Sequence, residues 1–146
     1  MPIEHHQGDL LTSDCEAIAH GCNCFNTMGA GIAKQIKMRY PMAYEADCET
    51  IAGDKEKLGD FSIAFENDRM IFNLYTQYNM GRDLSYPALE SSLRKLKNSL
   101  DFVDENQNLV LGLPRIGCGI AGGDWPRVEE IINNVFAKRT VRVYTL

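Results

Sequence analysis

The sequence predicts an α/β domain in which helices cover a mixed sheet of six strands. Short apolar runs typical of strands alternate with helical runs from one end of the chain to the other. No linker, repeat or low-complexity stretch interrupts this alternation. The length of 146 residues suits one domain with one continuous core. We therefore expect residues 1–146 to form a single domain.

Six runs rich in apolar and β-branched residues are predicted as strands. They span the first few residues to about His6, Ala17 to His20, Phe61 to Phe65, Met70 to Tyr75, Leu109 to Leu113, and Val141 to Thr145. The polar segment from Glu66 to Arg69 separates the third and fourth runs, and its length is typical of a β-hairpin. At least one pair of strands is therefore expected to be antiparallel, which makes the sheet mixed.

The first two predicted helices lie between residues 31 and 60. One runs from Gly31 to about Arg39 and ends there, because Tyr40 precedes a proline and is pushed toward extended geometry. The next starts at Pro41, since proline is favoured in the first turn of a helix.

Two further helices are predicted in the second half of the chain. The longest follows Ser85, and the last begins at Trp125 with Asp124 as its N-cap and Pro126 in its first turn. Apolar residues recur at helical spacing in both, and we expect them to face the sheet: Leu89, Leu93, Leu96, Leu100, Val103, Val128, Ile131, Ile132 and Val135.

Charge and hydropathy exclude several classes of protein. Fifteen Lys and Arg against twenty Asp and Glu leave a net charge of -5, so no electrostatic attraction to nucleic acid is built in. No stretch approaches the roughly 20 apolar residues of a membrane helix. The first ten residues lack the basic start and apolar core of a signal peptide. We expect a soluble, cytoplasmic protein without direct nucleic-acid or membrane binding.

Five cysteines, at positions 15, 22, 24, 48 and 118, cannot all pair, and free thiols in a reducing compartment fit their spacing. His20, Cys22 and Cys24 place an imidazole and two thiols close together, as zinc sites do. No second Cys-x-x-Cys or His-x-x-x-His pair follows downstream. We therefore favour small, semi-buried thiols over zinc and expect neither metal nor cofactor.

Two glycine-rich loops join a predicted strand to a predicted helix. The first loop (residues 21–33) contains Gly21, Gly29 and Gly31, and the second loop (residues 114–123) contains four glycines. Such loops let the backbone approach a ligand, and the N–H groups of the following helix favour an anion such as phosphate. Glycines also serve simply in tight turns. Two similar loops at the carboxyl ends of strands nevertheless favour a phosphate-bearing ligand.

Familiar phosphate-binding motifs do not fit these loops. The run from Gly117 to Gly122 matches Gly-x-Gly-x-x-Gly, but it leaves room for only one more strand and lacks the acidic residue about 20 positions on. The run from Gly29 to Lys34 lacks P-loop spacing. Neither Cys24 nor Cys118 is followed by the anion-binding arginine of a cysteine phosphatase.

Taken together, five segments resemble the macro domain, an ADP-ribose-binding family. They are Gly8 to Leu11, His20 to Asn23, Met28 to Ala33, Pro114 to Gly123, and the ending Val143 to Leu146. The resemblance is greatest to the branch of yeast ADP-ribose-1''-phosphate phosphatase and human terminal ADP-ribose protein glycohydrolase. It implies a single three-layer α/β/α domain over residues 1–146, with ADP-ribose or its 1''-phosphate as ligand.

The resemblance also implies individual ligand contacts. Asp9 would accept from the adenine amino group, Leu10 would line that pocket, and Tyr144 and Leu146 would sandwich the base. Asn23 would bind the distal ribose hydroxyls. Two glycine-rich segments would hold the diphosphate and distal ribose: Gly29, Ala30, Gly31, Ile32 and Ala33, and Gly117, Cys118, Gly119, Ile120, Ala121 and Gly122. Without the family, the residues alone would favour Tyr144 as a core residue at the sheet edge and Asn23 as a turn residue.

Two departures from the family bear on activity. The positions of the glycohydrolase lysine and aspartate hold Gln77 and Ala121, so the lysine-dependent mechanism is not expected. Hydrolysis of the terminal phosphate of ADP-ribose-1''-phosphate is the predicted activity, with Asn23 as a catalytic residue. The base stays open among His20, Asp83 and Asp124. Each has a structural alternative, as a strand-end histidine, a solvated loop charge and a helix N-cap.

Two other functions remain open. One is hydrolysis of ADP-ribosylated protein or of O-acetyl-ADP-ribose by substrate-assisted water attack, which needs Asn23 but no lysine. The other is a reader that binds ADP-ribose without turnover. The small size without an appended domain argues mildly against a reader, and a monomer is expected.

Overall fold

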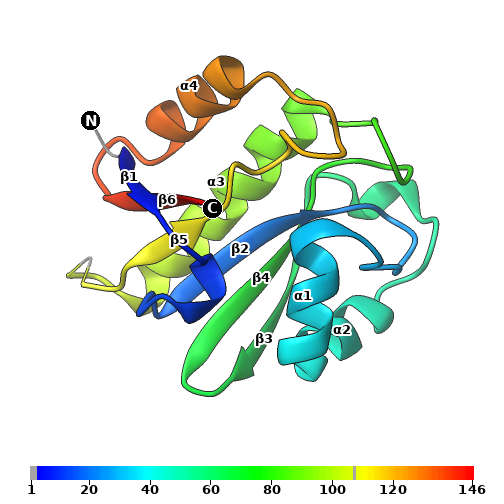
Figure 1. The fold of residues 1–146 in the computed structure, drawn as a ribbon, viewed down its shortest axis with the longest axis horizontal. Helices are drawn as coiled ribbons and strands as arrows, with labels where there is room; N and C mark the ends of the chain where they lie inside the picture. The colour runs from blue at the N-terminus through cyan, green and yellow to red at the C-terminus, as the bar shows by residue number, and fades with distance from the viewer. Residues whose placement is uncertain (1–2, 107) are drawn as a thin grey trace.

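Six strands form one mixed sheet in the order β1-β6-β5-β2-β4-β3 (Figure 1). The structure, a computed structural model, describes residues 3–106 and 108–146. All neighbouring strands are parallel except β3 and β4, which confirms the mixed sheet. The part of the first predicted strand before Ile3 lies outside the described residues. The strands are β1 (Ile3–Gln7), β2 (Ala17–Cys22), β3 (Phe61–Glu66), β4 (Arg69–Tyr75), β5 (Leu111–Leu113) and β6 (Val141–Thr145).

The turn between β3 and β4 is tighter than the four polar residues predicted. Glu66 and Arg69 pair with each other as the last rung of the hairpin. The two turn residues, Asn67 and Asp68, have φ angles of 53° and 59°. Positive φ at both positions is typical of the type I′ turn, whose twist matches that of the flanking strands.

Strand β5 is shorter than predicted, because side chains take the N–H groups of its expected first residues. Oδ2 of Asp104 accepts from the N–H of Leu109 at 2.8 Å, and Oε1 of Glu16 accepts from that of Val110 at 2.8 Å. The strand assigned from Leu109 therefore begins at Leu111.

Helices cover both faces of the sheet, as Figure 1 shows, and make the predicted three-layer α/β/α arrangement. They are α1 (Gly31–Arg39), α2 (Pro41–Cys48), α3 (Tyr86–Val103) and α4 (Trp125–Val135), with short 3-10 turns η1 (Leu10–Thr12) and η2 (Lys55–Lys57). One core lies between the sheet and α3 and α4, and the other between the sheet and α1, α2 and η1. No helix in the described residues has the length and apolar character needed to cross a bilayer.

The predicted inward-facing residues of α3 and α4 form most of one core. Leu89, Leu93, Leu96 and Leu100 have no exposed surface, and Val128, Ile132 and Val135 are buried with them. Ile131 is half-buried against the same core. The prediction for Val103 is wrong: it is the last residue of α3, beyond the part that packs on the sheet, and it is 63% exposed.

Candidate functional site

A cavity of about 480 Å³ opens at the carboxyl ends of β2, β4 and β5. It is lined by residues 21–23, 27–33, 76–77, 80–81, 114–117 and 119–121, so the first and second loops form much of its wall. From the neighbouring strands β2 and β5 the chain continues to α1 on one face of the sheet and α4 on the other. Ligands of open α/β sheets bind in such a crevice.

The cavity wall is poor in charge. Among the residues that the structure describes, Arg115 is the one charged side chain on it, and no carboxylate lines it. Helix α1 begins at this wall with Ala30 as its N-cap, and no described side chain caps it. The N–H groups of the first turn are therefore left for a ligand, at the positive end of the helix dipole. An anionic ligand suits this wall.

Left-handed backbone shapes the first loop. Asn26, Met28 and Gly31 have φ angles of 58°, 40° and 59°. Met28 keeps this conformation because its side chain is buried in the core beneath α1. Glycine at position 31 adopts it without a steric penalty, at the point where the chain turns into α1.

The second loop is folded tightly on itself. The N–H of Gly123 donates to the carbonyl of Gly117 at 2.7 Å, and Gly117 and Gly122 have φ angles of 75° and 80°. This fold leaves Cys118 and Gly122 off the cavity wall, although both were predicted to contact the ligand. The thiol of Cys118 donates instead to the carbonyl of Ile116 at 3.5 Å.

Asn23 lies on the cavity wall with its side-chain amide held from both ends. Its Nδ2 donates to Oγ1 of Thr27 at 2.7 Å, and its Oδ1 accepts from the N–H of Phe25 at 2.8 Å. Both bonds are local to the first loop, so the loop that shapes the wall also orients the amide. The structure therefore brings Asn23 together with Gly29 to Ala33, and its contact with a ligand stays a prediction.

Gln77 and Ala121 both lie on the cavity wall. Nε2 of Gln77 donates to the carbonyls of Asn79 and Gly81 at 2.7 and 2.8 Å, so both of its N–H groups are used within its own loop. Asp83 accepts from the N–H of Asn79 at 2.8 Å and does not line the cavity. Gln77 and Asp83, which the sequence analysis considered in connection with catalysis, thus stabilise the loop after β4.

The prediction of His20 as a catalytic base is not supported by its position. The ring is fully buried, is absent from the cavity wall, and its Nε2 lies 2.7 Å from Oδ1 of Asn73. Burial lowers the pKa of His20 to about 4, against the effect of the hydrogen bond to Asn73, which raises it. The imidazole is therefore neutral near pH 7, but it is buried and away from the cavity wall.

Asp124 is the N-cap residue of α4, as predicted, but its side chain makes no capping bond with a described residue. Its backbone N–H donates to the hydroxyl of Tyr86 at 3.0 Å. The residue is exposed and does not line the cavity, which argues against its predicted catalytic role. Within residues 3–106 and 108–146, no three His, Cys, Asp or Glu side chains are grouped to hold a metal.

The residues predicted around the adenine lie outside the cavity wall, near the ends of β1 and β6. Asp9 caps η1 by accepting from the N–H of Leu11 at 3.0 Å, and its Oδ2 lies 3.6 Å from Nη2 of Arg39. Leu10 is buried in the core against which Tyr144 packs. Leu146 is 90% exposed.

The ring of Tyr144 is stacked on His6, with ring centroids 5.2 Å apart, while its hydroxyl accepts from the thiol of Cys15 at 3.7 Å. The structure therefore places Leu10 and Tyr144 in one region and leaves the adenine contacts as predictions.

Sequence reasoning missed several residues of the wall, and Thr76 is the most informative. Its side chain is buried, and its Oγ1 has no hydrogen-bond partner among the described residues. It directly follows the last residue of β4, so its place at the carboxyl end of a strand was the available signal. Thr27 and Arg115, which lie within the two glycine-rich loops, and Met80 were not singled out either.

The sequence is similar to those of several known proteins over nearly its whole length. The chain is 37% identical over 147 residues to an uncharacterised 17.5 kDa protein in the tk-vs intergenic region of Enterobacteria phage T4, covering 94% of this chain and 92% of that protein. It is 29% identical to the ADP-ribose glycohydrolase OARD1 of Homo sapiens, covering 99% and 91%. It is 28% identical to the ADP-ribose 1''-phosphate phosphatase of Debaryomyces hansenii, covering 99% of both chains.

The fold is also similar to that of a solved structure over nearly the whole chain. The macrodomain of Mycobacterium tuberculosis DarG superimposes with a TM-score of 0.81 at 25% identity, covering 99% of this chain and 97% of that one. The family model of the macro domain matches residues 19–132, which include both glycine-rich loops and most of the sheet. The chain therefore belongs to the macro domain family.

Proposed function

We propose that the cavity binds ADP-ribose and that the protein hydrolyses the terminal phosphate of ADP-ribose-1''-phosphate. One observation carries the proposal: two glycine-rich loops and the uncapped start of α1 share a cavity wall without a carboxylate among the described residues. A diphosphate or terminal phosphate brings negative charge. Backbone N–H donors and the positive end of a helix compensate such charge without a lysine.

The named relatives support a hydrolase, and their names give two different reactions. The relatives include an ADP-ribose glycohydrolase and ADP-ribose 1''-phosphate phosphatases. The lysine-dependent glycohydrolase mechanism needs an amine and a carboxylate, whereas the corresponding wall positions here are Gln77 and Ala121. A neutral amide that already donates two hydrogen bonds is no amine nucleophile. Attack of water on phosphorus needs no amine nucleophile.

In the proposed reaction, water attacks phosphorus and the bond between phosphorus and the C1'' oxygen of the ribose breaks. The products are ADP-ribose and inorganic phosphate. Charge in such a loose transition state lies on the phosphoryl oxygens, so positioning and N–H donors contribute more than a strong base. Asn23, held by Thr27 and by the N–H of Phe25, would orient the distal ribose against the loops.

The same wall suits a second candidate, a reader that binds ADP-ribose without turnover. The observation in its favour is that His20, Asp83 and Asp124, the candidate bases, all lie off the cavity wall. The two candidates share one binding site and differ only in whether phosphate is released.

A phosphorus NMR time course with ADP-ribose-1''-phosphate tests both candidates in one tube. We expect a growing signal of free phosphate with the natural protein and none with Asn23→Ala, whose fold is checked by circular dichroism. Asn98→Ala, on an exposed position of α3, is the matched control. Broadened ligand signals without phosphate release would leave the reader or a hydrolase of another linkage, such as ADP-ribosylated protein. Unchanged ligand signals would contradict ADP-ribose binding itself.

A further inference from the structure

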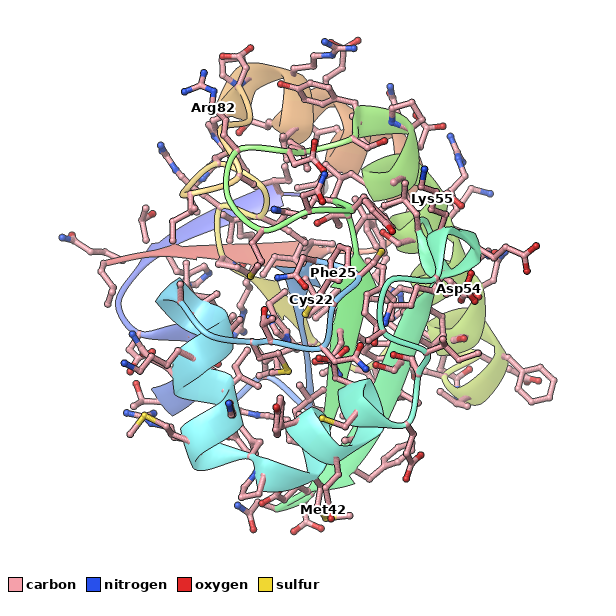
Figure 2. All side chains as sticks on the ribbon, turned by 90° about the vertical axis from the view of Figure 1, so that its right-hand side faces the viewer. Cys22, Phe25, Met42, Asp54, Lys55 and Arg82 are labelled. Carbon is pink, nitrogen blue, oxygen red and sulfur yellow. The ribbon has the colours of Figure 1, made fainter. Side chains whose placement is uncertain are left out.

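The segment between α2 and β3, residues 49–60, packs against the first loop without contributing to the cavity wall. The N–H of Gly53 donates to the carbonyl of Cys24 at 2.6 Å, and the ring of Phe25 lies over Gly53. Figure 2 labels Asp54 and Lys55 on this segment, and Phe25 and Cys22 on the first loop. Residues 49–60, in which the sequence shows no motif, therefore hold the first loop from the side away from the cavity wall.

The shortest side-chain hydrogen bond between the two segments joins Lys57 to Asn26. Nζ of Lys57 donates to Oδ1 of Asn26 at 2.6 Å and to Oγ1 of Thr50 at 2.8 Å. Nδ2 of Asn26 donates to the carbonyl of Thr50 at 2.8 Å. The Asn26 amide is thus bonded at both ends, while its backbone has a φ of 58°, in the left-handed region that asparagine adopts more readily than most residues other than glycine.

Lys57 is a buried cation in the neighbourhood of the buried carboxyl group of Asp47. Its residue is 8% exposed, and its Nζ lies 4.8 Å from the centre of the Tyr75 ring. The Tyr75 hydroxyl donates to Oδ1 of the buried Asp47 at 2.7 Å. Burial raises the pKa of Asp47, and the nearby charge of Lys57 acts in the opposite direction. A cation kept buried in this way presents a strong, directed donor to the first loop.

We infer that Lys57 is a positioning residue for the ligand site: through Asn26 it holds the first loop in the conformation that lines the cavity. Lys57 itself does not touch the wall, whereas residues 27–33, which follow Asn26 directly, do. The inference rests on the proposed function, because ADP-ribose is the ligand used to test it.

Calorimetric titration with ADP-ribose tests the inference on folded variants. Lys57→Met keeps most of the length of the side chain and removes the donor, and we expect affinity to fall about tenfold or more, as for other misplaced binding groups. Asn26→Ala should cause a similar loss. The double variant should be no weaker than the weaker single variant, because both changes remove one interaction. Lys97→Met is the matched control, since Lys97 also donates a 2.7 Å bond, to Asp101 on α3, and should bind normally.

Lys57→Met removes the positive charge that lies near the buried Asp47. The free energy of unfolding can fall far enough from this change to unfold the protein. Asn26→Ala then carries the test, because it leaves Lys57 beside Asp47. Amide hydrogen exchange without ligand gives a second readout: exchange of residues 24–30 should accelerate in Asn26→Ala, while exchange in β2 and β4 stays slow.

Affinity and hydrogen exchange together separate the hypotheses. Affinity within twofold of the natural protein for Asn26→Ala, or for a folded Lys57→Met, would overturn the positioning role, and so would fully additive losses. A natural protein that does not bind ADP-ribose would reject the proposed function alone. Exchange of residues 24–30 would then decide the inference, since unchanged exchange in Asn26→Ala contradicts it and accelerated exchange supports it.

Discussion

The side-chain amide of Asn23 donates a 2.7 Å hydrogen bond to the hydroxyl of Thr27, four residues further along the same loop. The bond orients Asn23 at the cavity wall, where the proposed reaction takes place. Thr27→Val keeps the shape of the side chain and removes the acceptor, which leaves the amide held only by the N–H of Phe25.

We expect Thr27→Val to lower the kcat for phosphate release from ADP-ribose-1''-phosphate by about 10- to 100-fold, in the range caused by small misplacements of catalytic groups. Thr27→Ser retains the hydroxyl and should keep most of the activity. Equal activity in the valine and serine variants would show that the hydrogen bond does not orient Asn23. The measurement is steady-state phosphate release on variants with matching circular dichroism spectra.

Asp9 is predicted to accept from the adenine amino group, and its Oδ2 already lies 3.6 Å from Nη2 of Arg39. Asp9→Ala should weaken ADP-ribose binding by about 10- to 100-fold, because a hydrogen bond to a charged acceptor contributes about 1.5–3 kcal/mol. Calorimetry gives the affinity. Glu90→Ala removes a carboxylate from an exposed ion pair on α3 and should leave binding unchanged. Equal affinity of Asp9→Ala and the natural protein would refute the adenine contact.

The buried His20 predicts a dependence of stability on pH. Burial lowers its pKa from 6.5 to about 4 in the folded protein, so between these values the unfolded chain binds a proton that the folded one does not. Its contribution to stability is complete above pH 6.5 and is lost as the pH falls toward 4. The free energy of unfolding should fall by up to ~1.4 kcal/mol per pH unit in this window.

Urea denaturation between pH 7 and pH 4 measures this slope. His20→Gln keeps a donor for Asn73 without a titrating ring and should flatten the slope. His5→Gln changes an exposed histidine of β1 and should leave it as it is. An identical slope in the natural protein and in His20→Gln would show that His20 does not cause the effect.

Gly112 in β5 lies beneath η1 with no room for a side chain. A Cβ at this position would lie 2.6 Å from Cδ1 of Leu10 and 2.8 Å from Sγ of Cys15, both buried. Gly112→Ala should therefore lower the free energy of unfolding by about 1–3 kcal/mol, as overpacked cores do. Gly119→Ala, where a Cβ meets nothing within 4 Å, should change it by less than about 0.5 kcal/mol. Chemical denaturation compares the two variants, and equal stability would contradict the overpacking argument.

Local sequence determined the elements and the two loops of this protein. Alternating apolar residues and the proline at position 41 predicted strands and helix starts that the structure has, because backbone geometry depends mainly on neighbouring residues. The glycines of both loops were predicted at the carboxyl ends of strands, and Gly29, Gly31, Gly117 and Gly119 line one cavity. Sheet topology is enough to bring such ends together.

Only the tertiary structure decided which polar side chains face that cavity. His20 is sealed beneath α2, where Asn73 bonds both its ring and the carbonyl of Ala43, and neither partner is near it in the sequence. Lys57 meets Asn26 across 31 positions of the chain. Contacts of this kind depend on how helices pack on the sheet, and burial then decides the protonation and hydrogen-bonding of each group, which no local pattern of residues encodes.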